Sequence, residues 1–160
     1  NGLVNCDFNG LWSNENGWWY LTGGKIDFDD NGLASNEHGW WQIHGGKVDF
    51  DYNGLTPNEH GWWRLAGGKI DFDYNGFASN ENGNWRVIGG KIDFNRTGVD
   101  FDGVSWWRVE GGKVNTNYNG IAQNEYGWWY IRHGKVVFNF TGWTKVSSGR
   151  YYVHNGCVAR

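Results

Sequence analysis

The chain is poor in the residues that build helices and ordinary hydrophobic cores. Its 160 residues include one proline, no methionine and two cysteines, whereas glycine occurs 27 times and tryptophan 13 times. Globular domains on average carry glycine at roughly 7% and are rich in leucine and alanine. No apolar periodicity of the helical kind persists along the sequence, and we therefore expect an all-β chain built from turns and aromatic rings.

Two further absences exclude whole classes of partner. The formal net charge is -3 and the isoelectric point is about 5.9, so the chain lacks the basic face that neutralises phosphates, and we expect no nucleic-acid partner. No run approaches the ~18 apolar residues that span a bilayer, so membrane insertion is not expected. The first residues, Asn1-Gly2-Leu3, have no signal-peptide features, and any export signal is expected upstream.

What is present is a repeat. Units of 22 residues follow one another without insertion or deletion, and residues 1–8 match the tail of an earlier unit. The units begin at Asn9, Asn31, Asn53, Asn75, Thr97, Asn119 and Thr141. We interpret residues 1–160 as one repeat array, expected to be the C-terminal part of a larger secreted protein.

Each unit contains a strong hairpin signal. Gly24 recurs in every unit and is preceded by glycine five times, then by His133 and Asn155. Gly-Gly and Asn-Gly pairs favour type I′ turns, which need positive φ at both central positions. We therefore expect each unit to be one β-hairpin, with the Ser-Asn-Glu-Asn-Gly stretch as a polar loop. The unit at Thr97 departs from this pattern over residues 100–105, where we expect a bend or a different loop.

Pairing across the Gly23-Gly24 turn divides the side chains between two faces. Trp19, Leu21, Ile26 and Phe28 share one face, which we expect to be the core. Trp18 and its equivalents then lie on the opposite, polar face. One hairpin is marginal in water, so neighbouring units must stack, which predicts a solenoid (superhelical stack) of about seven hairpins.

Such a stack separates the two cysteines. Strands are spaced by about 4.8 Å, so almost seven units place Cys6 and Cys157 much further apart than the ~7 Å between Cα atoms that a disulfide tolerates. We expect no disulfide between them within one chain.

The aromatic hairpins resemble a known family. Gly-Trp-Trp-Tyr-Leu-Thr-Gly-Gly-Lys-Ile at residues 17–26 and Gly-Arg-Tyr-Tyr-Val-His-Asn-Gly at residues 149–156 are similar to the cell-wall-binding repeats, which include choline-binding and glucan-binding repeats. The resemblance extends over all 160 residues. It implies a superhelix of hairpins in which Trp18 and Tyr20 face a ligand and Trp19 packs inside.

The resemblance leaves two ligands open. Choline-binding repeats typically close with Gly-Trp, which supplies another ring of the choline cage, and here only Gly142-Trp143 matches. The unit is also longer than usual between Lys25 and Asn31. These departures favour a sugar platform, with choline or teichoic acid as the alternative.

The candidate carbohydrate-binding residues are aromatic or polar side chains of the face opposite the predicted core. Sugars pack their C–H faces on rings while polar neighbours bind the hydroxyls. The candidates are Trp18, Trp40, Trp62, Trp106 and Trp128, then Tyr20, Gln42, Arg64 and Tyr130 on the same face, and Tyr52, Tyr74 and Tyr118 at the second turn. If these rings only pack hairpins together, the array is instead a structural or adhesive spacer.

Metal and catalytic sites are not expected. Asp27-Phe28-Asp29-Asp30-Asn31-Gly32 fits the first half of a calcium loop, but His38 stands where the distal glutamate belongs. The histidines fall in different positions of the repeat, and no catalytic motif occurs. The sequence thus predicts a non-enzymatic, cofactor-free, monomeric array on the bacterial cell surface or outside the cell, binding a polysaccharide.

Overall fold

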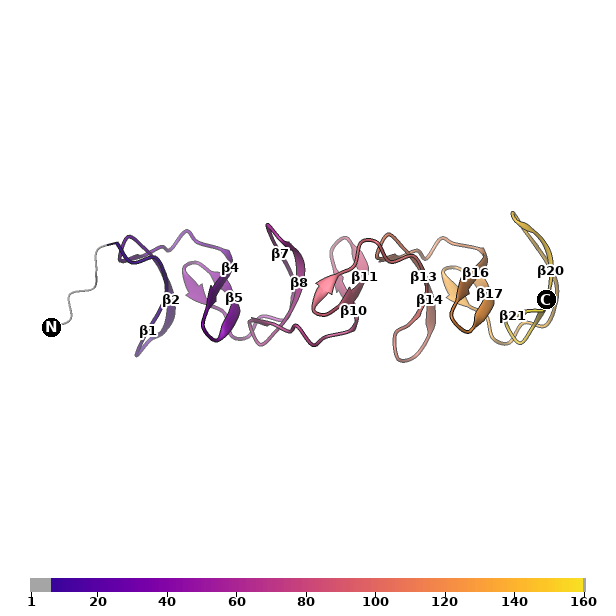
Figure 1. The fold of residues 1–160 in the computed structure, drawn as a ribbon, viewed down its shortest axis with the longest axis horizontal. Coiled ribbons are helices and arrows are strands. Elements are labelled where there is room, and N and C mark those ends of the chain that lie inside the picture. The colour runs from indigo at the N-terminus through magenta and orange to yellow at the C-terminus, as the bar shows by residue number, and fades with distance from the viewer. Residues whose placement is uncertain (1–6, 160) are drawn as a thin grey trace. The chain divides into compact units, whose positions relative to one another are not determined.

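The structure is a computed structural model that describes residues 7–159, and every regular element in this range is a β-strand. The strands come in sets of three, one set for each repeat (Figure 1). The predicted all-β fold of about seven hairpin repeats is therefore confirmed. None of the described residues belongs to a helix that could cross a membrane.

Each repeat contributes two longer strands and one of two residues. The first strands are β1 (Gly10–Asn14), β4 (Gly32–Asn36), β7 (Gly54–Asn58), β10 (Gly76–Asn80), β13 (Gly98–Phe101), β16 (Gly120–Asn124) and β19 (Gly142–Val146). The second strands are β2 (Gly17–Thr22), β5 (Gly39–His44), β8 (Gly61–Ala66), β11 (Gly83–Ile88), β14 (Trp106–Glu110), β17 (Gly127–Arg132) and β20 (Gly149–His154). The third strands are β3 (Lys25–Ile26), β6 (Lys47–Val48), β9 (Lys69–Ile70), β12 (Lys91–Ile92), β15 (Lys113–Val114), β18 (Lys135–Val136) and β21 (Cys157–Val158).

The first and second strands of a repeat form a hairpin, and its turn lies within the stretch that was expected to be a loop. β1 pairs with β2 along its whole length, and Glu15 and Asn16 form the turn between them. Asn14 Oδ1 accepts the backbone N–H of Asn16 at 2.8 Å, an interaction by which asparagine stabilises tight turns. The interpretation of Ser-Asn-Glu-Asn-Gly as an irregular loop is therefore wrong, because its first two residues are strand.

The predicted Gly-Gly turn is confirmed as the link from the second to the third strand. Its φ angles are 57° and 75° at the pair Gly23-Gly24, as a type I′ turn requires. A Cβ on Gly46, the second glycine of the next unit, would lie 2.3 Å from the carbonyl oxygen of Asp27. Only glycine fits there. The first position tolerates His133 and Asn155, both with positive φ.

The repeat at Thr97 keeps its hairpin but has a different loop, as the sequence indicated. β13 and β14 pair from Gly98 to Phe101, and Phe101 lies opposite Trp106. The four residues between them close the loop, where the backbone N–H of Asp102 donates to the carbonyl of Ser105 at 3.0 Å.

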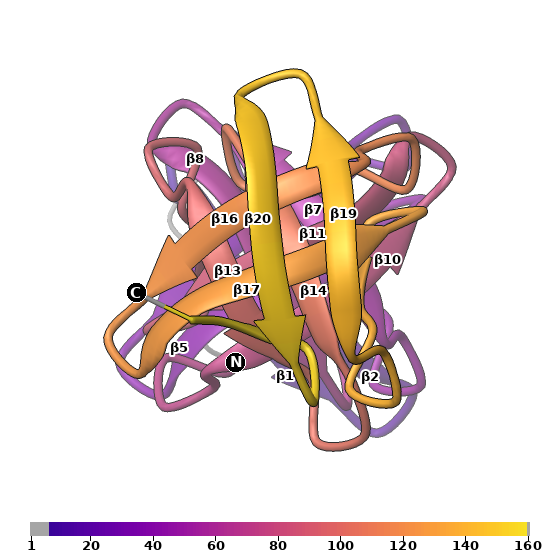
Figure 2. The same ribbon diagram turned by 90° about the vertical axis from the view of Figure 1, so that its right-hand side faces the viewer.

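The chain divides into two compact units. The first is Asn1–Asn80 with Ile88–Ile92, and the second is Glu81–Val87 with Asp93–Arg160. In the second unit, the hairpin of β19 and β20 runs across the hairpin of β16 and β17, so consecutive hairpins have different directions (Figure 2).

Backbone hydrogen bonds join consecutive repeats within each unit. In the first unit, Trp19 of β2 pairs with Lys47 of β6, and the N–H of Tyr20 donates to the carbonyl of Gly46 at 2.8 Å. In the second unit, Trp129 of β17 pairs in the same way with Cys157 of β21. The third strand therefore serves two repeats, its own and the preceding one.

The core contains one apolar side chain from each second strand. These side chains are Leu21, Ile43, Leu65, Val87, Val109, Ile131 and Val153, and all are buried. Residues of the third strands, such as Val48 and Ile70, are buried with them. This part of the predicted core is confirmed.

The prediction that Phe28 and its equivalents belong to the core is wrong. Phe28 is 65% exposed, and its equivalents Phe50, Phe72, Phe94 and Phe138 are also exposed. The reason is that the third strand ends after two residues and the chain turns, so the alternation of a strand no longer applies to Phe28.

Cys157 lies in the third strand of the last repeat and is a half-buried free thiol. The expectation that it forms no disulfide with Cys6 involves a residue outside the described range.

Candidate ligand-binding pockets between repeats

Six of the seven second strands contain a tryptophan at the same position of the repeat, and a side-chain oxygen of the first strand or the following loop holds most of these rings in place. We call these residues the pocket tryptophans: Trp19, Trp41, Trp63, Trp85, Trp107 and Trp129. The indole N–H of Trp41 donates to Asn36 Oδ1 at 2.9 Å, and that oxygen also accepts the backbone N–H of His38 at 2.9 Å. One asparagine thereby fixes both the ring and the hairpin turn.

The same arrangement recurs along the chain. The indole N–H donates to the side-chain oxygen of Asn14 at 3.1 Å, Asn58 at 2.9 Å, Asp102 at 2.7 Å and Asn124 at 2.8 Å. Because an indole has a single N–H donor, this hydrogen bond determines which way each ring lies.

An exposed phenylalanine packs edge-on against most pocket tryptophans. The ring centroids of Trp41 and Phe50 are 5.5 Å apart with an interplanar angle of 75°, a favoured T-shaped geometry. The pairs of Trp63 with Phe72, Trp85 with Phe94 and Trp129 with Phe138 are also 5.5 Å apart. The phenylalanines that the sequence assigned to the core instead form walls at the surface.

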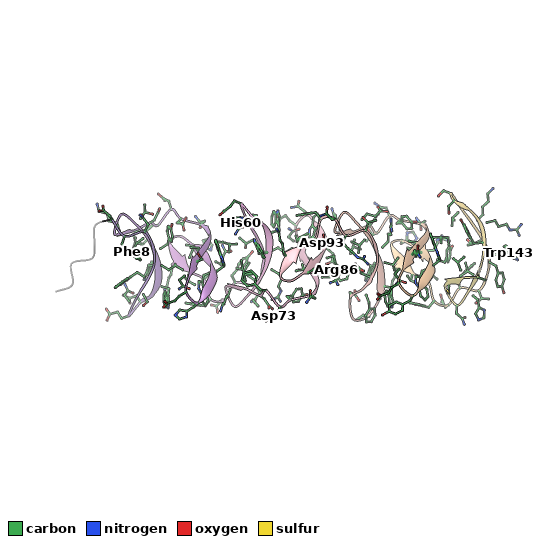
Figure 3. The ribbon with its side chains drawn as sticks, viewed as in Figure 1. Phe8, His60, Asp73, Arg86, Asp93 and Trp143 are labelled. Carbon is green, nitrogen blue, oxygen red and sulfur yellow. The ribbon has the colours of Figure 1, made fainter. Side chains whose placement is uncertain are left out.

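These parts enclose a pocket in the first unit. It has a volume of about 240 Å³ and is lined by Trp18, Asn36, His38, Trp41, Val48, Phe50 and Lys69. The residues come from three consecutive repeats, so no single hairpin forms the pocket. Trp18 and His38 meet edge to face, with ring centroids 6.5 Å apart. His60, the equivalent of His38 one repeat later, lies near the tip of the β7–β8 hairpin (Figure 3).

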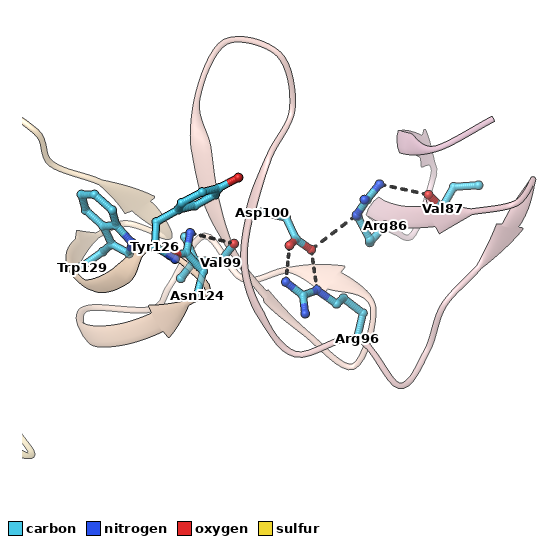
Figure 4. Close-up of polar contacts among 8 residues, drawn as sticks. All are labelled: Arg86, Val87, Arg96, Val99, Asp100, Asn124, Tyr126 and Trp129. Carbon is cyan, nitrogen blue, oxygen red and sulfur yellow. Dashed lines mark hydrogen bonds and ion pairs between the residues drawn. The ribbon is translucent and has the colours of Figure 1, made fainter. Parts of the chain in front are cut away.

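The second unit brings together the equivalent residues with two changes. Tyr126 replaces the histidine and packs edge-on against Trp106, with centroids 5.7 Å apart. Asn124 lies beside both residues (Figure 4), and its Oδ1 accepts the backbone N–H of Tyr126 at 2.9 Å and the indole N–H of Trp129 at 2.8 Å. Cys157 replaces the lysine, because it pairs with Trp129 as Lys69 pairs with Trp41. The rings of Trp106, Tyr126, Trp129 and Phe138 therefore occupy the repeat positions of the pocket residues of the first unit, and the third strand supplies no ammonium group there.

The structure does not separate the two adjacent tryptophans into one surface ring and one core ring. Trp18 and Trp41 are both half-buried, and both pack against a core cluster that contains Ala34, Ile43 and Val48. Both also line the pocket. The strict division between outward and inward rings is therefore wrong, because the outward face of one hairpin is covered by the next. Trp40, Trp62 and Trp128 are half-buried as well.

The other candidate residues of the polar face contact side chains of their own or of a neighbouring repeat. The guanidinium of Arg64 lies 4.5 Å from the ring centroid of Tyr74, and Gln42 accepts a hydrogen bond from Thr56 at 2.7 Å. Tyr20 packs against the same core cluster as Trp18. Tyr130 is only 5% exposed. This face is thus largely used to join hairpins.

The tyrosines of the second turn are tied to the next strand. The hydroxyls of Tyr52, Tyr74 and Tyr118 donate to the carbonyls of Leu55, Phe77 and Ile121 at 3.2, 2.6 and 2.8 Å. These hydroxyls already have a protein acceptor.

Sequence reasoning missed four of the pocket residues: Asn36, His38, Phe50 and Lys69. A signal for the asparagine was available, because Asn14, Asn36, Asn58, Asn80 and Asn124 occupy one position of the repeat. The lysine also recurs at one position of the repeat, but its contact with a tryptophan of the preceding repeat depends on how repeats stack.

The aspartate-rich turns have a structural explanation. Asp27 Oδ1 accepts the backbone N–H of Asp29 at 3.2 Å, and Asp49 Oδ1 accepts that of Asp51 at 3.1 Å. Within residues 7–159, no three His, Cys, Asp or Glu side chains gather where they could hold a metal ion.

Comparison with known proteins agrees with this repeat pattern. A model of the choline-binding repeat matches residues 7–27, 29–49, 51–71, 73–93, 101–115, 117–137 and 139–159. All of these matched segments correspond to this binding repeat. A search of curated proteins finds no significant match.

Solved structures with a similar chain path are distant in sequence. Choline binding protein F from Streptococcus pneumoniae is 19% identical over 95% of this chain and 52% of its own, with a TM-score of 0.37. The same protein in the presence of a peptidoglycan analogue is 18% identical, with the same coverage and a TM-score of 0.38. Alternansucrase in complex with isomaltononaose is 12% identical over 95% of this chain and 12% of its own, with a TM-score of 0.42.

The chain thus spans about half the length of the first of these structures. The family match is decisive because it extends over most of the sequence, repeat by repeat, in the register that the strands define. The chain belongs to the choline-binding repeat family, whose repeats bind components of the bacterial cell wall.

Proposed function

We propose that this chain is a non-catalytic module that binds a cell-wall polysaccharide through the pockets between its repeats and so attaches its parent protein to the bacterial surface. The observation that supports this is the pocket of Trp18, Trp41 and Phe50, in which rings stand beside the polar groups of Asn36 and His38. A sugar needs both, because its C–H face packs on a ring and its hydroxyls need hydrogen-bond partners.

Several weak pockets along the chain can together bind a polymer with useful affinity. One site of about 240 Å³ is smaller than the roughly 300–1,000 Å³ of typical ligand pockets, so each is expected to bind weakly. A polymer engages several sites at once, and effective concentration then raises the overall affinity. The half-buried tryptophans proposed for ligand contact are Trp18, Trp40, Trp62, Trp106 and Trp128.

The test is a titration with purified cell-wall polysaccharide, followed by intrinsic tryptophan fluorescence and affinity electrophoresis. Phe50→Ala and Phe72→Ala each remove one exposed wall, so each should weaken binding severalfold with little change in melting temperature. Trp143→Ala is the control, because Trp143 is 61% exposed and does not line the pocket of Trp18, Trp41 and Phe50. A titration without saturable change for the unmodified chain would favour the spacer function instead.

A second candidate ligand is a quaternary ammonium group such as choline. One observation favours it: in the second unit Trp106 packs edge-on against Tyr126, Trp129 packs edge-on against Phe138, and Cys157 stands in the place of the lysine. Aromatic cages of this kind attract quaternary ammonium ions through the negative faces of their rings. Titration with choline, followed by the indole N–H signal of Trp129, tests this site separately from the polysaccharide.

A further inference from the structure

The lysine that begins each third strand lies over the pocket tryptophan of the preceding repeat. Lys69 Nζ is 5.4 Å from the ring centroid of Trp41, within the ~6 Å range of a cation–π interaction. The corresponding distances are 5.2 Å for Lys47 over Trp19, 5.4 Å for Lys91 over Trp63, 5.6 Å for Lys113 over Trp85 and 5.5 Å for Lys135 over Trp107. Five independent copies therefore place an ammonium on the same ring face.

A glycine lies beneath the stem of four of these five lysines, and Ser105 takes that position for Lys135. A Cβ built on Gly39 would lie 2.4 Å from Lys69 Cε, which is far too close for two carbon atoms. Gly61 with Lys91 and Gly83 with Lys113 give the same 2.4 Å. The stem thus crosses bare backbone, and the ring contact is not the chance position of a surface side chain.

The ammonium groups keep their charge unneutralised by carboxylates. None of the ion pairs within residues 7–159 involves one of these lysines. The lysines are also exposed, so their remaining N–H donors are available to a ligand in the pocket.

We infer that these lysines are specificity-determining residues, resident cations that exclude quaternary ammonium ligands from the pockets and restrict them to neutral or anionic glycans. The inference rests on the proposed glycan-binding function. A second cation at Trp41 would meet a like charge at close range and a ring face already in use. A hydroxyl or an acidic group instead finds the three N–H donors of an ammonium.

The last repeat lacks the lysine and can be compared with the repeats that have it. Cys157 takes the lysine position beside Trp129, and its sulfur lies 3.8 Å from a Cβ built on Gly127. The ring face of Trp129 therefore carries no resident cation. Among the pockets of this chain, it is the one that the inference leaves open to a quaternary ammonium ion.

The experiment titrates choline chloride into the full chain and follows the indole N–H signals by NMR. Lys69→Met keeps the apolar stem and removes the charge, so choline affinity at Trp41 should rise about tenfold, as expected for removal of a like charge at about 5 Å. Cys157→Lys should abolish the response of Trp129. Lys145→Met is the control for loss of an exposed ammonium, because Lys145 lies in β19 and pairs with Arg150 rather than with a pocket tryptophan.

The inference is overturned if Lys69→Met melts like the unmodified chain and its Trp41 signal responds to choline no better than before. In that case the lysine only covers the ring with its stem. The polysaccharide titration is run in parallel on the unmodified chain. Failure of that titration with a gain of choline binding in Lys69→Met would refute the glycan function and leave the lysine as the gate against cations. Normal glycan binding of the unmodified chain, without a gain of choline binding in Lys69→Met, would support the glycan function and refute the role of the lysine.

Discussion

Asp100 is the residue whose removal should reveal how the fourth and fifth repeats of the chain are joined. Its Oδ2 accepts a hydrogen bond from Arg96 Nε at 2.8 Å, and its Oδ1 bonds Arg96 Nη2. Arg86 Nε lies 3.4 Å from Asp100 Oδ2, so one carboxylate bridges two guanidinium groups (Figure 4). Together, the hydrogen bonds and charges raise the pKa of Arg96.

This trio replaces a ring contact found in other repeats. Arg64 lies over Tyr74 at 4.5 Å, and Arg108 over Tyr118 at 4.8 Å. At the same position as these tyrosines the fourth repeat has Arg96, which brings two arginines together. Asp100 stands where five other units have alanine or threonine and the first has Trp12. The carboxylate is therefore a compensation for the missing tyrosine.

The magnitude follows from burial. The Asp100 side chain is 12% exposed, whereas Arg86 and Arg96 are 21% and 35% exposed. Breaking a fully buried ion pair costs about 3–5 kcal/mol, and the partial exposure of the arginines reduces the expected cost of Asp100→Ala to about 2–3 kcal/mol. For a chain of this size, that corresponds to a melting temperature lower by roughly 5–10 °C.

The assay is thermal unfolding followed by circular dichroism, with Asp73→Ala as the control for loss of an exposed carboxylate. The double variant Arg96→Tyr with Asp100→Ala restores the pattern of the other repeats and should recover most of the lost stability. A single variant that melts like the control, or a double variant no better than Asp100→Ala, would refute the idea that the carboxylate balances two arginines.

The structure predicts the results of three further experiments. Asn58→Ala should lower the free energy of unfolding in urea by about 1–2 kcal/mol, because Trp63 Nε1 and the N–H of His60 lose their acceptor. Asn58→Asp should be nearly neutral, since Asp102 holds Trp107 in the same way. Gly68→Ala should lower the melting temperature strongly, because its Cβ would meet the carbonyl oxygen of Asp49 at 2.1 Å, while Gly67→Asn should be tolerated, as Asn155 shows. EDTA should leave the melting temperature unchanged, and a fall of many degrees would mean that the aspartate turns bind calcium.

The local parts of the fold could be predicted from the sequence because local rules determine them. Positive φ at Gly23 and Gly24 and the burial of Leu21 opposite Ile26 follow from one turn and one alternation. The turn at Glu15 and Asn16 was missed because its signal is a side chain: Asn14 Oδ1 satisfies the backbone of the turn, and neither turn residue needs positive φ.

The pocket was beyond sequence reasoning because it depends on stacking. Alternation along β5 predicts that Trp40 and Trp41 lie on opposite faces, but it says nothing about what covers either face. The stack places Lys69 of the next repeat over Trp41 and Trp18 of the preceding repeat beside it. A ring that one hairpin directs toward the core therefore becomes the floor of a pocket once three repeats are assembled. Under the proposed function the ligand binds between repeats, so a substitution in one repeat should change binding at a pocket centred on another.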